Sequence, residues 1–241
     1  MNTESRPTEN PESEEQNADP APSVESAQVS GTTEDAALAL LKSPDVTAEA
    51  LAQLAKNPIT STSRKVMVGL AAHPRTPRHV SIPLLRRMFT FDLMHMALAP
   101  AVAPDIKRAA EDHILTRLES LPTGQKITLA RRASGRVAAG LLQDSDRRVI
   151  VAAVDNAKLT EPLVVQALMK PNAPETLFVL VSEHSKWSQR REVQIVLLRS
   201  ENTPLERAID FARNFSPEFL REVTPKQRSS VLISELSKTT E

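Results

Sequence analysis

Short amphipathic stripes recur along the chain from residue 34 onward. In the clearest stripe, apolar residues are spaced by three and four positions: Leu205, Ala208, Ile209 and Ala212. Charged side chains occupy the other side of this segment, and a stripe of the same period runs through residues 106–118. The spacing is typical of an α-helix with one buried face. Residues 162–169 and 177–181 are apolar nearly all round, which predicts inner helices covered on several sides.

Proline residues separate these stripes. Proline is tolerated at the start of a helix but costs about 3 kcal/mol in its interior. Thr203-Pro204 is predicted to supply the N-cap and the first helical position, and Glu206 would complete a capping box. Similar starts are predicted at three further pairs: Thr76-Pro77, Ser216-Pro217 and Thr224-Pro225. Pro83 is the exception, and we expect it to delay or kink its helix.

The proline spacing predicts an all-α fold. It gives about a dozen helices of about 8–15 residues joined by tight turns, so that successive helices are antiparallel neighbours. Helices this short are marginal alone in water, and each must bury a face against the next. A recurrence of roughly 30 residues per helix pair favours an α-solenoid over a four-helix bundle, whose helices would be longer.

The composition excludes several classes of fold and of functional site. The 241 residues include no cysteine, which excludes a disulfide-stapled domain, a thiolate zinc module and a thiol nucleophile. Aromatic residues make up only 3% of the chain, which argues against a sheet-rich fold.

The N-terminal segment differs from the rest of the chain. Residues 1–33 hold seven acidic side chains and one basic, a net charge of −6, with four prolines and few bulky apolar residues. Such a segment cannot bury enough surface to offset its ordering entropy, so we expect a disordered tail before a helical repeat domain over residues 34–241. That domain has 29 basic and 23 acidic side chains, a net charge of +6. The tail is either a solubilising tether or a self-masking arm that competes for a basic groove.

Signals for secretion and membrane insertion are absent from the sequence. The first residues lack the basic start and apolar stretch of a secretory signal. The longest apolar run, residues 149–154, is far shorter than the roughly 20 residues that span a bilayer. We therefore expect a cytoplasmic protein with no membrane partner.

Three runs carry a family resemblance: residues 55–58, residues 72–77 and residues 141–149. They are similar to bacterial HEAT-like and leucine-rich-repeat-variant arrays, whose repeats carry an Asn-Pro-x-Thr-Pro connector and an Asp-x-Asp-x-x-Val helix start. The resemblance covers the pattern of residues 36–200 and comes closest over residues 144–168. The chain lacks the cysteines of the leucine-rich variant's iron–sulfur module, so no such cluster is expected. The resemblance implies a superhelical scaffold that binds other macromolecules and has no fixed chemistry.

The usual motifs of catalysis and cofactor binding do not occur. Gly135 and Gly140 stand five apart with no following Lys-Ser or Lys-Thr, so they indicate close helix packing and not a phosphate loop. The five histidines form no metal-binding pair, and the lone tryptophan, Trp187, is interpreted as a staple or core residue. No catalytic residue, metal or cofactor is predicted.

Two sets of residues are candidate partner-binding positions. The first set consists of paired and neighbouring arginines: Arg86, Arg87, Arg131, Arg132, Arg136, Arg147 and Arg148. If equivalent positions of successive repeats share one surface, these residues form a basic ridge for an acidic protein segment or a phosphate backbone. Alternatively, they are solvated and neutralised by acidic neighbours such as Glu111, Asp144 and Asp146.

The second set lies in the segment 89–98, which is rich in phenylalanine and methionine. Phe89, Phe91 and Met94 are the candidates, because methionine-rich apolar faces adapt to irregular partners. The alternative is that they form ordinary core.

These observations favour a non-enzymatic scaffold that binds a protein partner. A nucleic-acid-binding repeat protein that uses the paired arginines is the second hypothesis, although aromatic residues for base stacking are scarce. An enzyme on a HEAT-like scaffold is the third, and it would need a pocket holding a carboxylate with a shifted pKa.

Overall fold

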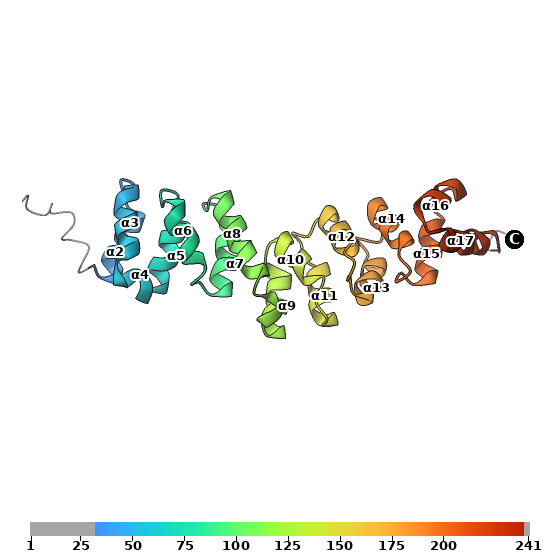
Figure 1. Cartoon of the computed structure of the whole chain (residues 1–241), viewed down its shortest axis with the longest axis horizontal. Coiled ribbons are helices and arrows are strands. Elements are labelled where there is room, and N and C mark those ends of the chain that lie inside the picture. Colours follow the sequence, from blue (N-terminus) through green and yellow to red (C-terminus); the bar gives the residue numbers. More distant parts are fainter. Residues whose placement is uncertain (1–31, 239–241) are drawn as a thin grey trace, which may run out of the picture.

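The computed structural model describes residues 32–238, and most of them lie in helices. The N-terminal half, coloured blue to green in Figure 1, contains α2 (Glu34–Lys42), α3 (Ala48–Lys56), α4 (Pro58–Thr62), α5 (Arg64–Ala72), α6 (Arg78–Leu85), α7 (Thr90–Leu98), α8 (Pro104–Leu115) and the 3₁₀ turn η1 (Leu118–Ser120). The remaining helices are α9 (Thr123–Arg132), α10 (Gly135–Leu141), α11 (Arg147–Val154), α12 (Glu161–Leu168), α13 (Glu175–Glu183), α14 (Arg191–Arg199), α15 (Leu205–Ala212), α16 (Pro217–Val223) and α17 (Lys226–Lys238). No strand occurs between residues 32 and 238, so the all-α prediction is confirmed.

The α-helices of the described part are more numerous and shorter than predicted. There are sixteen, of 5 to 13 residues. One reason is that capping residues divide the chain where no stripe shows a break. The side chain of Asn57 accepts from the Ile59 amide at 2.9 Å to begin α4. Ser63 ends that helix and caps the next, accepting from the Val66 amide at 3.3 Å. A single polar oxygen satisfies an amide that the new helix leaves unpaired.

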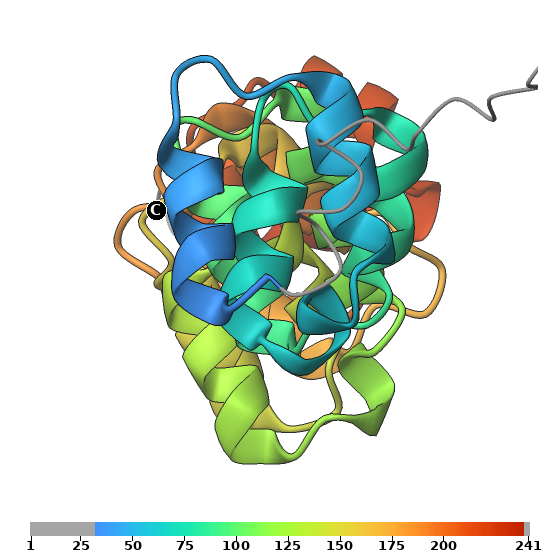
Figure 2. The ribbon, with the colours of Figure 1, turned by 90° about the vertical axis from the view of Figure 1, so that its left-hand side faces the viewer.

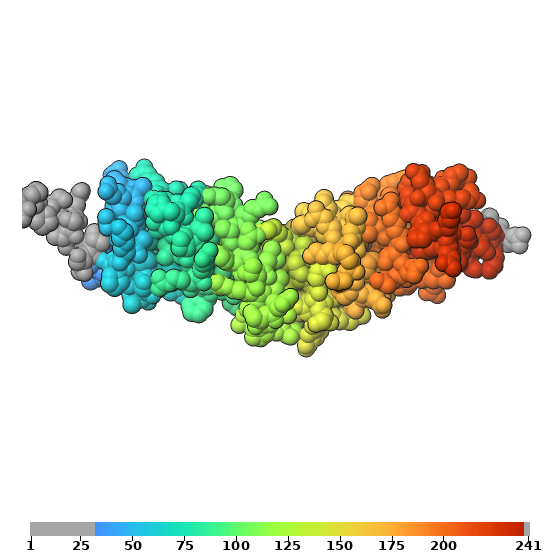
Figure 3. Space-filling view, viewed as in Figure 1, coloured from blue at the N-terminus to red at the C-terminus, as the bar shows by residue number. Residues whose placement is uncertain are grey.

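The helices form two rows along one axis (Figure 1). The first row contains α2, α5, α7, α9, α11, α13, α15 and α17, and the second contains α3, α6, α8, α10, α12, α14 and α16. From α6 to α16, each helix of the second row contacts the next member of that row. Figure 2 looks along the axis from the N-terminal end, with the later helices behind α2 to α6. The body is elongated, and its outline in Figure 3 is hollowed between α8 and α12.

The connectors lie on two opposite edges because successive helices alternate between rows. The first edge carries the connectors that leave the first row: 43–47, 73–77, 99–103, 133–134, 155–160, 184–190 and 213–216. The second edge carries those that leave the second row: 57–63, 86–89, 116–122, 142–146, 169–174, 200–204 and 224–225. Helix termini gather at both edges, and so do their unpaired carbonyl groups.

Side chains of one connector bind carbonyl groups of an earlier unit. On the first edge, the Arg75 Nη1 donates to the Val46 carbonyl at 3.0 Å, and the Lys186 Nζ donates to the Leu159 carbonyl at 3.4 Å. The Asn156 amide reaches the Ala130 carbonyl at 2.6 Å. Each bond spans 26 to 29 residues of sequence. Carbonyls of a connector or of a helix end are therefore bonded by a side chain of the following unit.

The core consists mainly of small aliphatic side chains and follows the whole length of the body. Trp187 is its largest member and is only 1% exposed. Its Nε1 donates to the Val154 carbonyl at 3.0 Å, so the core interpretation of this residue is confirmed. Pro83 lies inside α6, and that helix ends two residues later, at Leu85.

The acidic segment predicted to be disordered falls almost entirely outside the described residues. Thr33 is the N-cap of α2, and its side chain accepts from the Ala36 amide at 3.4 Å. No helix within residues 32–238 is both long and apolar enough to cross a membrane.

Gly135 and Gly140 lie where helices and connectors come closest. A Cβ added at Gly135 would stand 2.2 Å from the Lys158 carbonyl oxygen, and one at Gly140 would stand 2.5 Å from the Leu115 Cδ2. Both distances are shorter than any ordinary contact. The prediction that these glycines permit close packing is confirmed.

Gly135→Ala should destabilise the protein by about 1–3 kcal/mol, because the added methyl meets backbone that cannot move aside. Gly124→Ala is the matched control, since a Cβ at Gly124 meets nothing within 4 Å. That control should be neutral or stabilising by up to about 1 kcal/mol. Urea unfolding of the two variants checks this, and equal midpoints would contradict the packing at Gly135.

The predicted N-cap role of Thr203 is wrong. Pro204 occupies the N-cap of α15, and no side chain caps that helix. The Thr203 hydroxyl donates instead to the Leu197 carbonyl of the preceding helix at 2.7 Å. Thr76 bonds the Leu70 carbonyl in the same way, at 2.7 Å, and Pro77 is the N-cap of α6. The Leu197 carbonyl also accepts the Ser200 amide, and the Leu70 carbonyl accepts the His73 amide. Each hydroxyl therefore supplies a second donor to a carbonyl at the end of the preceding helix and does not cap the next one.

The other two predicted helix starts, Ser216-Pro217 and Thr224-Pro225, differ from each other. Thr224 also donates backward, to the Leu220 carbonyl at 2.6 Å. Ser216 is the one cap of this group that is confirmed, accepting from the Phe219 amide at 3.3 Å.

Thr203→Val should lower the free energy of unfolding by about 0.5–1.5 kcal/mol, because it keeps the shape but removes one of the two donors to the Leu197 carbonyl, leaving only the Ser200 amide. Thr203→Ser keeps the hydroxyl and should cost less than Thr203→Val. Chemical denaturation of both variants measures the difference. If valine were tolerated better than serine, the backward hydrogen bond would not contribute to stability.

Candidate functional site

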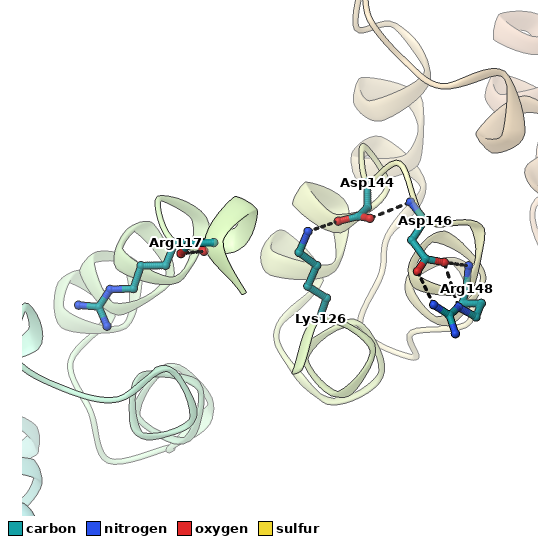
Figure 4. A network of polar contacts seen from close by, with 6 residues as sticks. Arg117, Lys126, Asp144, Asp146 and Arg148 are labelled. Carbon is teal, nitrogen blue, oxygen red and sulfur yellow. Dashed lines mark hydrogen bonds and ion pairs between the residues drawn. The ribbon is translucent and has the colours of Figure 1, made fainter. Parts of the chain in front are cut away.

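The arginine pairs do not all lie on one edge, so the prediction of a single basic ridge formed by all of them is wrong. Lys126, near the start of α9, forms an ion pair with Asp144 at 2.9 Å, just before α11 (Figure 4). This contact places the N-termini of both helices on the second edge. Arg131-Arg132, at the C-terminus of α9, therefore lies on the first edge, while Arg147-Arg148 begins α11 on the second. The reason is that one pair ends its helix and the other begins its helix.

Two of the candidate arginines are held by neighbouring carboxylates. Arg136 pairs with Asp112 at 2.5 Å and with Glu111 at 3.5 Å. Arg148 pairs with Asp146 at 2.8 Å, as Figure 4 shows. The Arg148 side chain, and then its backbone amide, lower the pKa of the Asp146 carboxyl. Neutralisation by acidic neighbours is thus the correct interpretation for Arg136 and Arg148.

The three candidates of the segment 89–98 fall into two groups, buried packing residues and one exposed residue. Met94 is 2% exposed, and Phe91 is partly buried against the core, so both are ordinary packing residues. Phe89 is 66% exposed. It is the most exposed large apolar side chain of residues 32–238, and it stands beside Arg86 and Arg87.

Arg86, Arg87 and Phe89 form what we term the 86–89 cluster, on the second edge between α6 and α7. Met88 is buried and anchors this connector, while its neighbours point outward. Arg117 holds it from the next connector, donating to the Met88 and Arg86 carbonyls, each at 2.7 Å. Within residues 32–238, neither Arg86 nor Arg87 forms an ion pair.

Arg64 joins this cluster to the first row. Its guanidinium carbon lies 5.2 Å from the centre of the Phe89 ring, within range of a cation–π interaction. The same guanidinium binds both oxygens of the buried Asp92, at 2.6 and 2.7 Å. Arg64 thereby has a fixed orientation beside the ring. Sequence reasoning missed it because its partners stand 25 and 28 positions away.

An open groove continues from Arg64 along α2 and α5. Its lining residues are Glu34, Thr62, Ser63, Arg64, Lys65, Val68, Gly69 and Asp92. A second, smaller hollow lies further along the second edge, between the ends of α12 and α14. Met169, which is 63% exposed, and Lys170 line it. Exposed apolar and basic side chains thus stand together at two places on this edge.

The electrostatic character of the cluster is visible at His113, on α8. The pKa of its imidazole is lowered from the ordinary value of 6.5, first by burial and then by the positive charges of Arg117 and Arg86. Asp112 opposes this effect. Arg117 and Arg86 are thus close enough to His113 to disfavour its protonated form.

No group of three or more histidine, cysteine, aspartate or glutamate side chains between residues 32 and 238 is arranged to hold a metal ion. No protein-family model, curated protein or solved structure matches this chain. The resemblance to HEAT-like and leucine-rich-repeat-variant arrays therefore stays a prediction.

Arg86→Glu should raise the pKa of His113, because it replaces a repelling positive charge with an attracting negative one. Arg131→Glu makes the same charge change on the first edge and should leave that pKa unchanged. NMR titration of the imidazole signals measures both. An unchanged His113 pKa in Arg86→Glu would show that Arg86 is too far from His113 to affect it.

The same shift makes the stability of the wild-type chain depend on pH. Since the folded-state pKa of His113 lies below its unfolded-state value, the unfolded chain binds more protons just below pH 6.5. The contribution of His113 to stability is thus lost as the pH falls through this range. Arg86→Glu should reduce that loss.

Proposed function

We propose that this protein is a non-enzymatic α-solenoid scaffold of the HEAT-like class, and that it binds an acidic protein segment with apolar side chains through the 86–89 cluster. The observation that carries the proposal is Phe89, an exposed aromatic ring beside Arg86 and Arg87, which form no ion pair in the described part of the chain.

The repeating connectors support the solenoid assignment. Five connectors of the first edge each bury one residue shortly before the following helix: Val46, Thr76, Val102, Leu159 and Trp187. Along the N-terminal half, these positions are 30 and 26 residues apart. Such a period, with each unit contacting its neighbours, is typical of stacked helix pairs.

Phe89 breaks two local rules of folding at once. It occupies the N-cap of α7, where serine, threonine, aspartate or asparagine would satisfy an amide that phenylalanine leaves unbonded. Its ring is also left in water, although covering a phenylalanine side chain is worth about 1.5–3 kcal/mol. Positions where a sequence violates local preferences tend to be functional. Arginine and aromatic residues are also the types that dominate binding energy at protein interfaces.

The chemistry of the cluster defines the partner. Arg86 and Arg87 select carboxylates, and Phe89 selects an apolar side chain next to them. A nucleic-acid duplex is a poorer fit, because Arg131-Arg132 lies on the edge opposite to the other pairs and Arg148 is paired with Asp146. The arginines therefore offer no continuous track for a phosphate backbone.

The double variant Arg86→Glu/Arg87→Glu tests this function in affinity capture from native lysate with the full chain as bait. We expect a protein that the wild type retains to be lost, or reduced at least about tenfold, because two attractive contacts become repulsive. Phe89→Ala should weaken the same capture without changing the net charge.

Arg131→Glu/Arg132→Glu is the control, since it makes an equal charge change on the first edge. It should retain the partner, and melting curves should show that both double variants are folded. Equal loss in both double variants would indicate a nonspecific charge effect and contradict the proposal. Capture of nucleic acid that weakens steeply with salt would favour the second hypothesis instead.

A further inference from the structure

The N-terminal segment enters the folded body at the groove beside the 86–89 cluster. Residues 1–31 precede Thr33, the N-cap of α2, and the next residue, Glu34, lines the groove. The Glu34 carboxylate lies 3.5 Å from the Lys65 Nζ on α5. The groove then continues to Arg64, which stacks against Phe89. A path along one surface therefore joins the attachment point of the segment to the exposed ring.

The charges of the segment and the cluster are complementary. Residues 9–25 contain six acidic side chains and no basic one. Arg86 and Arg87 form no ion pair within residues 32–238, and Arg117, which donates to the Arg86 and Met88 carbonyls, adds a third positive charge beside them. The segment also has apolar side chains, Val24 and Val29, that could cover Phe89.

The covalent link makes this contact favourable even if it is weak. Asp19 stands 13 residues before Thr32, and an extended chain spans about 3.3 Å per residue, which allows a reach of about 40 Å. A tethered group of this kind has an effective concentration in the millimolar range. A free partner displaces the segment when the ratio of its concentration to its dissociation constant exceeds the ratio of that effective concentration to the dissociation constant of the segment.

We infer that the acidic segment 9–25 docks on the 86–89 cluster of its own chain and competes with the external partner for that surface. The inference rests on the proposed function of the cluster, and it identifies the built-in competitor as an acidic peptide. The docked segment sets a threshold for partner binding, and neutralising its carboxylates lowers that threshold.

Paramagnetic relaxation in the full chain tests the docking directly. The sequence has no cysteine, so Ala18→Cys provides a unique position for a nitroxide spin label. We expect the label to broaden the backbone amide signals of residues 87–89 and 117 more than those of residues 131–132 on the first edge. The broadening should fall at least severalfold in Arg86→Glu/Arg87→Glu and in 0.5 M NaCl, and it should persist in Arg131→Glu/Arg132→Glu.

A second variant changes the segment and leaves the folded body intact. It replaces the six acidic residues by their amides: E9Q, E12Q, E14Q, E15Q, D19N and E25Q. We expect this change to abolish the broadening at the cluster. A synthetic peptide of residues 1–31 should then bind the same variant at the cluster, with an affinity reduced at least about tenfold by Arg86→Glu/Arg87→Glu.

Three outcomes would overturn the inference. They are equal broadening on both edges, broadening that survives Arg86→Glu/Arg87→Glu, and broadening seen only between spin-labelled and unlabelled copies in a mixture. Failure here is distinguishable from failure of the proposed function. If docking is absent but Arg86→Glu/Arg87→Glu still loses an external partner, the cluster remains a binding surface without an internal competitor.

Discussion

The structure depends on how the carbonyl groups at helix ends are satisfied. A chain of many short helices has an unusually large share of such groups, and each one that is buried without a partner destabilises the fold. Here Arg75, Asn156, Lys186 and Arg117 each reach back to carbonyls of an earlier unit. The threonine hydroxyls at 76 and 203 do the same over a shorter distance. These bonds hold consecutive units in register where the aliphatic core alone would allow them to slide.

The need to satisfy these carbonyl groups explains why the sequence predicted the helices better than the connectors between them. Periodic apolar residues and prolines are local signals, and they were sufficient to predict the all-α class and the close packing at Gly135 and Gly140. The direction in which a hydroxyl points is not a local property. Thr203 precedes a proline in a sequence typical of a helix start, yet its oxygen donates to the helix before. Whether the hydroxyl bonds the preceding or the following helix depends on which groups are buried around it, and this is known only from the three-dimensional structure.

The candidate site follows the same division. Arg86, Arg87 and Phe89 could be selected from the sequence because they are adjacent and of unusual type. Their grouping with Arg64 and Arg117 could not, since those residues come from other units 22 to 31 positions away. The prediction of a common arginine ridge was wrong because it assumed that every pair occupies the same end of its helix. In an alternating stack, that end decides the edge.

Within residues 32–238, the strongest contacts of each helix are with helices that lie near it in the sequence. In the proposed solenoid, the loss of the last helix pair would remove one interface and leave the others intact, and a duplicated pair could pack against the existing end. Length in such a protein can change by whole units during evolution while the cluster between α6 and α7 stays as it is. A change in the number of units would thus alter the length of the molecule without altering the proposed binding surface.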